Sequence, residues 1–172
     1  MIRRQHMGQG ITEPAEVFNI EGLRIVRTNF KAGEWVTTKV PEKCSYQDWE
    51  SVHVHLNGTS SEVNNALPSI GHGWVSRHDD YVMEPGIYKR IFDSPTEYWC
   101  CLWTDERGCE DVEVIKLQIN ETYELPQNQT VFVLSGTGVI NSTILQAHEP
   151  VKLISGSAIL TATTELYALT WQ

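Results

Sequence analysis

Two histidines on one predicted strand are the residues whose type and spacing best fit chemistry in this sequence. His53 and His55 stand two positions apart in the run Val-His-Val-His-Leu, and side chains two apart on a β-strand point to the same face. Two imidazoles on one face can bind a single metal ion. Residues that could complete its ligand shell follow in the chain: His72, His78, Asp79, Asp80 and Glu84.

The apolar neighbours of this pair favour a different role. Val52, Val54 and Leu56 form the alternating apolar set that we expect to face a core. His53 and His55 would then point away from a barrel interior, as a neutral, hydrogen-bonded pair in a packing interface. Packing is our main interpretation, and a metal site with these two ligands is the alternative.

Other signals for catalysis are weak. Cys44 lies beside Lys43, whose charge would favour the thiolate, but a lone cysteine next to a lysine is common. The sequence has no Gly-x-Ser-x-Gly nucleophile elbow. The Gly8-Gln-Gly10 run neither follows a predicted strand nor begins a helix, so it does not predict a phosphate-binding loop. We therefore expect no catalytic residue and no cofactor.

The composition describes a folded chain with an excess of acidic residues. Of its 172 residues, 41% are hydrophobic and 20% are charged, and the net charge is −9. This balance excludes disorder, and it disfavours nucleic-acid binding, which needs clustered Lys and Arg. No apolar run is long enough to cross a bilayer, and no secretory signal opens the sequence. We expect a cytoplasmic protein with reduced cysteines and with no nucleic-acid or membrane partner.

Short strands are the predicted elements, and no helix is convincing. β-rich runs broken by Gly, Pro, Asn and Asp recur at the spacing of a β-sandwich or barrel. Residues 1–16 lack this pattern and are predicted to form an extended N-terminal arm. Arg3 and Arg4 in this arm would contact acidic side chains of a neighbouring subunit. The predicted strands are Leu23–Thr28, Trp35–Val40, Trp49–Leu56, Tyr81–Met83, Ile87–Phe92, Glu97–Trp103, Val112–Leu117, Thr130–Leu134, Gly138–Ile144, Val151–Ile154, Ala158–Thr163 and Glu165–Trp171.

An internal repeat indicates that the chain contains one β unit twice. The run Val52–Thr59 resembles Val131–Thr137, and each predicted strand ends in a Gly-Thr turn. Further on, Thr96–Trp103 matches Thr164–Trp171 without a gap, from Thr-Glu at the start to Trp at the end. Two matches in the same order predict β units over residues 17–104 and 111–172, joined by a polar turn.

In the rhythm of strands and turns, these residues resemble the cupin pattern. The resemblance covers most of the chain from about Phe30. It implies an all-β, cupin-like jelly roll, or double-stranded β-helix, made of two related β units packed together. The stretches that carry it are Phe30–Gly33, Glu50–Gly58 and Glu84–Gly86 in the first half, and Leu117–Pro126, Thr130–Asn141 and Leu153–Trp171 in the second.

The metal motifs of that family do not carry over. Cupin enzymes place their ligands in Gly-x5-His-x-His-x3-4-Glu-x6-Gly and in Gly-x5-Pro-x-Gly-x2-His-x3-Asn. After Gly33 the histidine positions hold Lys39-Val40-Pro41, and after Pro85-Gly86 no histidine stands in the second motif's place. The resemblance therefore implies a cupin-like fold without the metal ligands.

One strand that is apolar on both faces predicts association. The run Thr130–Leu134 is apolar without alternation, so both of its faces should be buried. We expect Phe132 and Leu134 to lie at an interface with the sister unit or another subunit. Six Trp and six Tyr point the same way, because aromatic side chains anchor interfaces. Self-association and contacts with other protein subunits are therefore expected.

Two functions follow from these expectations. The first is a non-catalytic structural or interaction protein in a homo-oligomer or larger assembly, similar to small cupin-like virion proteins of tailed bacteriophages. The second is a cupin-type enzyme, an isomerase or epimerase of a sugar derivative, or a protein that binds or sequesters a small molecule. Its pocket in the barrel mouth would draw on Glu50, His72, His78 and Tyr88.

Overall fold

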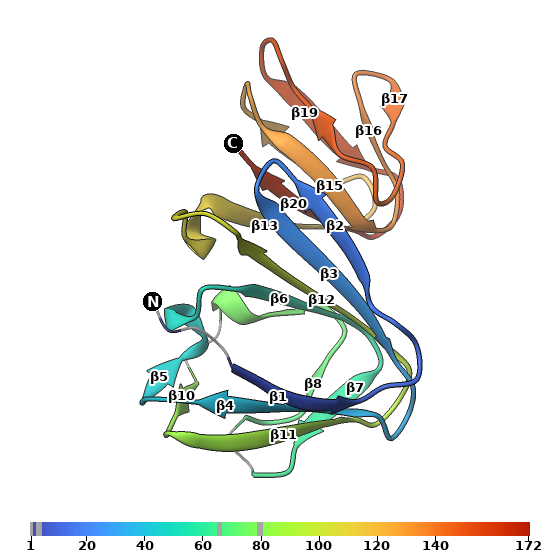
Figure 1. Ribbon diagram of the computed structural model, residues 1–172. Coiled ribbons are helices and arrows are strands. Elements are labelled where there is room, and N and C mark those ends of the chain that lie inside the picture. Colours follow the sequence, from blue (N-terminus) through green and yellow to red (C-terminus); the bar gives the residue numbers. More distant parts are fainter. Residues whose placement is uncertain (1, 3–4, 65–66, 79–80) are drawn as a thin grey trace. The chain divides into compact units, whose positions relative to one another are not determined.

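The computed structural model describes residues 2, 5–64, 67–78 and 81–172, and of His78 only the backbone (Figure 1). Most of the regular structure is β-strand, and the helical part consists of short 3-10 turns: η1 (Tyr46–Asp48), η2 (Ser76–His78) and η3 (Cys109–Asp111). Within these ranges, no helix combines the length and the apolar character that a membrane span needs. The chain divides into two compact units, Met1–Cys109 and Glu110–Gln172.

Two antiparallel sheets face each other in the first unit, with strand orders β2-β3-β12-β6-β9 and β1-β4-β11-β7-β8 (Figure 1). The stacked rings of Phe30 and Phe92, with centroids 3.7 Å apart, join the facing sheets. A short β5-β10 pair completes the unit. Its strands are β1 (Gln5–Gly10), β2 (Glu16–Ile20), β3 (Leu23–Phe30), β4 (Trp35–Val40), β5 (Cys44–Ser45), β6 (Val52–Asn57), β7 (Thr59–Glu62), β8 (Ile70–Gly71), β9 (Trp74–Val75), β10 (Val82–Met83), β11 (Gly86–Phe92) and β12 (Thr96–Trp103).

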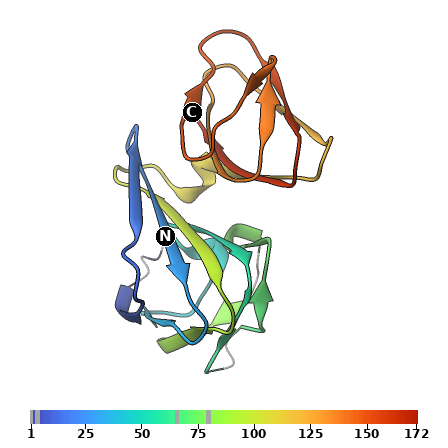
Figure 2. The same ribbon diagram turned by 90° about the vertical axis from the view of Figure 1, so that its right-hand side faces the viewer.

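The second unit also consists of two antiparallel sheets, with orders β13-β20-β15-β18 and β14-β19-β16-β17. Its interior holds an apolar cluster that includes Leu125, Leu160 and Leu166. Seen from another side in Figure 2, the strands of each unit curve around their own interior. The strands of the second unit are β13 (Val112–Leu117), β14 (Thr122–Leu125), β15 (Thr130–Ser135), β16 (Gly138–Ile140), β17 (Thr143–Ile144), β18 (Val151–Lys152), β19 (Ala158–Ala162) and β20 (Leu166–Trp171).

Both units have the same strand topology. The eight strands β13 to β20 correspond, in chain order, to β3, β4, β6, β7, β8, β9, β11 and β12. With this correspondence, each sheet of the second unit has the same strand order as one sheet of the first. This arrangement of eight antiparallel strands in two sheets is a jelly roll. The prediction of an all-β jelly roll in two related copies is thus confirmed by the strand order.

The repeated Gly-Thr turns have a steric cause. Gly58 follows β6 and Gly136 follows β15, at equivalent places in the two units. A Cβ atom on Gly58 would lie 2.4 Å from the carbonyl oxygen of Pro95, and one on Gly136 would lie 1.9 Å from that of Glu165. In each unit the turn therefore lies against the start of the last strand, where only glycine fits.

The N-terminal segment, predicted as an arm before the barrel, belongs to the sheets of the first unit. β1 pairs with β4, and β2 forms a hairpin with β3. Between these two strands, Thr12 donates its N–H and its hydroxyl to the Glu34 carboxylate at 2.9 and 2.8 Å. β1 was not predicted from the sequence, because an edge strand that is mostly exposed needs no alternating apolar pattern. Arg3 and Arg4 lie outside the described residues.

Substituting Gly136 tests the steric account of the turns. We expect Gly136→Ala to lower the free energy of unfolding of the second unit by roughly 3 kcal/mol or more. The new methyl group would overlap backbone atoms of Glu165, and the φ of +88° is itself unfavourable for alanine. Gly156→Ala is the matched control, with φ +69° and open space around the new methyl group, and should cost only about 1 kcal/mol. Urea unfolding measures both losses. Equal losses would contradict the close approach of Gly136 to Glu165.

Candidate functional site

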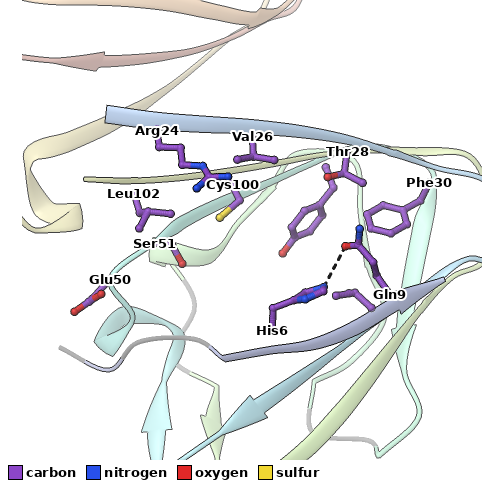
Figure 3. Close-up of a pocket in the computed structure, with 12 residues that line it drawn as sticks. His6, Gln9, Arg24, Val26, Thr28, Phe30, Glu50, Ser51, Cys100 and Leu102 are labelled. Carbon is purple, nitrogen blue, oxygen red and sulfur yellow. Dashed lines mark hydrogen bonds between the residues drawn. The ribbon is translucent and has the colours of Figure 1, made fainter. Parts of the chain in front are cut away.

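A cavity of about 540 Å³ lies between the two sheets of the first unit (Figure 3). Pockets for small organic molecules usually have about 300–1,000 Å³. One wall consists of alternate residues of two neighbouring strands, which point to the same face of the sheet. These residues are Arg24, Val26, Thr28 and Phe30 of β3, and Tyr98, Cys100 and Leu102 of β12.

Polar side chains lie toward both ends of this cavity. Figure 3 places Arg24, Glu50, Ser51 and Leu102 toward one end, and Thr28, Phe30 and Gln9 toward the other. Arg24 is exposed and forms no ion pair within the described part of the chain. The cavity thus combines a largely apolar wall with a cation that has no carboxylate partner among the described residues. Its remaining lining residues are His6 and Gln9 of β1, which are hydrogen-bonded at 3.1 Å, and Val36 of β4.

His53 is the buried centre of a hydrogen-bonded chain at the cavity wall. Its Nε2 lies 2.8 Å from Ser51 Oγ, and its Nδ1 lies 3.0 Å from Tyr98 Oη. A neutral imidazole has one donor and one acceptor nitrogen, so one of these hydroxyls donates to the ring and the other accepts from it. The ring of His53 is fully buried, while Ser51 and Tyr98 line the cavity.

His55 lies next to this chain but has a different environment. Its fully buried ring stacks on Phe92, and neither ring nitrogen has a hydrogen-bond partner among the described residues. Burial, followed by the charges of Arg90 and His72, lowers the pKa of His55 from 6.5 to about 4, which the nearby backbone of Gly71 opposes weakly. His55 is therefore neutral at pH 7.

The predicted direction of His53 and His55 is wrong. Both rings contact Tyr98 between the two sheets, so they face the interior of the first unit. Val52 and Val54 lie on the opposite face of β6 and are buried as well. Because both faces of this strand are buried, its apolar alternation does not show which face is the inner one.

An ion pair lies deeper in the same interior. Arg90 Nη2 is 3.1 Å from Glu62 Oε1, and both side chains are about 5% exposed. Arg90 also donates to Ser60 Oγ at 3.0 Å. A second, very small cavity of about 10 Å³ borders this pair, and Tyr88 lines it together with Arg90. The first unit thus fills part of its core with charged and polar groups.

The four residues predicted for a ligand pocket do not share one cavity. Glu50 lines the large cavity, and Tyr88 lines the small one and donates its hydroxyl to the Glu84 carbonyl at 2.6 Å. His72 is exposed, and its Nδ1 accepts the N–H of Asn57 at 2.9 Å. The side chain of His78 lies outside the described residues.

The two residues predicted at an interface lie on β15. Phe132 and Leu134 are almost completely buried, on the face opposite to Val131 and Val133. Val131 and Val133 belong to the apolar core of the second unit. Both faces of β15 are therefore buried, while an interface with another subunit stays a prediction.

The candidate ligands that the structure describes do not fit a divalent metal ion. Both ring nitrogens of His53 are hydrogen-bonded to hydroxyl groups. The positive charge of Arg90 lowers the pKa of neighbouring His55, and the same charge would repel a metal ion at that ring. Among the described residues no three His, Cys, Asp or Glu side chains are grouped as metal ligands. Asp79 and Asp80, which the sequence offered for the shell, lie outside the described residues.

The second unit replaces the polar chain by apolar side chains. Strand pairing sets His53 opposite Cys100 and Val133 opposite Ala168, and the gapless match makes Cys100 and Ala168 equivalent. Val133 therefore takes the place of His53. By the same match Leu166 takes the place of Tyr98, and both replacements lie in the apolar core.

Comparisons with known proteins show only distant likeness. No family model matches the chain, and no curated protein matches its sequence. The structure of AerE from Microcystis aeruginosa is 10% identical, with 95% of this chain and 94% of that one covered and a TM-score of 0.48. A cupin 2 conserved barrel domain protein from Leptotrichia buccalis is 13% identical, with 95% and 90% covered and a TM-score of 0.46. The pirin YhhW from Escherichia coli, in complex with nickel(II), is 11% identical, with 91% and 93% covered and a TM-score of 0.45.

The shifted pKa of His55 predicts an acid-sensitive fold. The unfolded chain binds a proton at His55 below about pH 6.5, whereas the folded chain does so only near pH 4, so stability falls as the pH drops through this window. The loss attributable to His55 is roughly 3 kcal/mol. Urea unfolding at pH 7 and pH 4.5 should show a smaller pH dependence for His55→Leu than for the wild type. The exposed control His6→Gln should keep the wild-type dependence, and an unchanged slope in His55→Leu would contradict the assignment.

Proposed function

We propose that the first unit binds a small organic acid in its cavity. The observation that carries this proposal is Arg24, which forms no ion pair with any described residue and lines a largely apolar cavity of about 540 Å³. A guanidinium binds a carboxylate through two parallel hydrogen bonds, and the apolar wall would hold the body of the ligand. The ligand would place its acid group near Arg24 and Ser51 and its apolar part toward Phe30 (Figure 3).

The difference between the two units supports this proposal. The second unit has the same strand order and closes its interior with aliphatic side chains such as Val133 and Leu166. Polar groups in a core are costly unless they are fully bonded. The polar side chains inside the first unit are therefore not a requirement of the jelly roll, and ligand binding gives them a reason.

A structural role in an assembly stays a prediction. The burial of Phe132 and Leu134 does not carry it, because both side chains are already covered within the single chain. Nothing in the described residues supports the more specific expectation of a virion protein. Native mass spectrometry of the full chain tests self-association, and a monomer at micromolar concentration would contradict the assembly role.

Charge removal at Arg24 tests ligand binding. Phenylacetate combines a carboxylate with an apolar ring, and we expect isothermal titration calorimetry to show one site per chain. Arg24→Gln should weaken binding about tenfold or more, the range for one charge-assisted hydrogen-bonded contact. Lys39→Gln removes the same charge from an exposed position outside the cavity and should leave the affinity unchanged. No binding to the wild type, or equal weakening in both variants, would overturn the proposal.

A further inference from the structure

We propose that Ser51, His53 and Tyr98 form a proton relay that isomerises the bound acid by moving one proton between two of its atoms. This inference rests on the proposed function, because the ligand must occupy the cavity. The substrate class is an enolisable oxo acid, in which a C–H bond stands beside a carbonyl group. The reaction is keto–enol tautomerisation, which needs no oxidant, reductant or co-substrate.

The relay has two ends that open into one cavity. Ser51 Oγ bonds Nε2 of His53 and Tyr98 Oη bonds Nδ1, so the two hydroxyls lie at opposite nitrogens of one imidazole. Both hydroxyl residues line the cavity, whereas His53 is fully buried behind them. A hydroxyl within 3.0 Å of an imidazole that another group orients is the arrangement that activates side-chain oxygens in catalysis.

Strand pairing fixes this geometry. Ser51 directly precedes β6, and His53, two residues further on, lies in that strand, with the two side chains close enough to form a hydrogen bond. Tyr98 comes from β12, where the register sets it opposite His55, next to His53 on the same face. The backbone N–H of His53 donates to Ser76 Oγ at 2.8 Å, which further fixes the strand. A relay held by two paired strands is preorganised before any ligand binds.

The proton transfers balance in both directions. Ser51 Oγ takes the proton from the C–H bond while its own proton passes to Nε2 of His53. The proton on Nδ1 passes to Tyr98 Oη, whose hydroxyl proton passes to the carbonyl oxygen of the ligand. The C–H electron pair becomes the enol double bond, and the carbonyl π pair becomes the new O–H bond. His53 ends as the other neutral tautomer, and the reverse reaction restores it.

This route leaves no net charge in a buried wall. Each residue gives one proton and receives one, so the net charge of the relay is the same before and after the reaction. Net charge in a desolvated site would be unfavourable. Arg24 would hold the carboxylate at its own end of the cavity, and the carbon and oxygen that exchange the proton would then lie toward the two hydroxyls.

The second unit shows that packing alone does not call for these three residues. Val133 and Leu166 take the places of His53 and Tyr98, and Val131, two residues before Val133, takes that of Ser51. All three belong to the apolar core. The same fold is therefore built without the relay in the second unit, whereas the first unit has it beside its cavity.

Deuterium exchange on phenylpyruvate tests the relay. Its carboxylate and ring suit the cavity, and its C3 protons exchange with D2O through the enol, which proton NMR follows. We expect the wild-type full chain to accelerate the exchange at least 100-fold over the buffer rate, the lower range for acid–base catalysis. Ser51→Ala and Tyr98→Phe should each lose most of this acceleration, while calorimetry still shows phenylpyruvate binding within about threefold of the wild type.

Matched controls separate a relay from a structural role. Ser61→Ala and Tyr167→Phe make the same changes outside the cavity and should keep full exchange. Thermal unfolding verifies that every variant is folded at the assay temperature. Binding without accelerated exchange in the wild type, or full exchange in both relay variants, overturns the relay and leaves the proposed function intact. Absence of phenylpyruvate binding to the wild type overturns the proposed function for this class of acid, and the relay with it.

Discussion

The pairing of β12 with both β3 and β6 is the constraint on which the cavity of the first unit depends. β12 pairs with β3 over eight residues, which sets Tyr98 beside Thr28 and Cys100 beside Val26 in one wall. On its other side it sets Cys100 opposite His53. A slip of one residue would turn every one of these side chains to the opposite face of the sheet. Backbone hydrogen bonds in a central strand thus decide which side chains meet in the cavity.

The polar interior of the first unit is a departure from what this fold needs for stability. Replacing a buried ion pair by well-packed apolar residues is often neutral or stabilising, so the pair of Arg90 and Glu62 is no requirement of the fold. The second unit demonstrates this within the same chain, because its equivalent sheets enclose an aliphatic core around Leu160. The two units therefore share a backbone plan and differ in what the sheets enclose, and the difference coincides with the presence of the cavity.

The fold was predictable from the sequence, whereas the site was not. Strand alternation and the repeated turns at Gly58 and Gly136 indicated two jelly rolls, since both are local signals with a steric cause. The relay joins Ser51 to Tyr98, which are distant in sequence and meet only through strand pairing. One usable signal lay in the gapless match of the last strands, where Tyr98 corresponds to Leu166. Where one copy of a repeat has a polar residue and the other has an apolar one at the same buried position, the two copies differ in function.

The wall of the cavity is least supported at β1. This strand pairs on one side only, with β4, and its register shifts between His6 and Gly8. Most of its residues are exposed, so few apolar contacts oppose its displacement. Beyond its end, Thr12 donates two hydrogen bonds to the Glu34 carboxylate, which fix the chain there. β1 contributes His6 and Gln9 to the lining, so this side of the cavity rests on an edge strand with few apolar contacts.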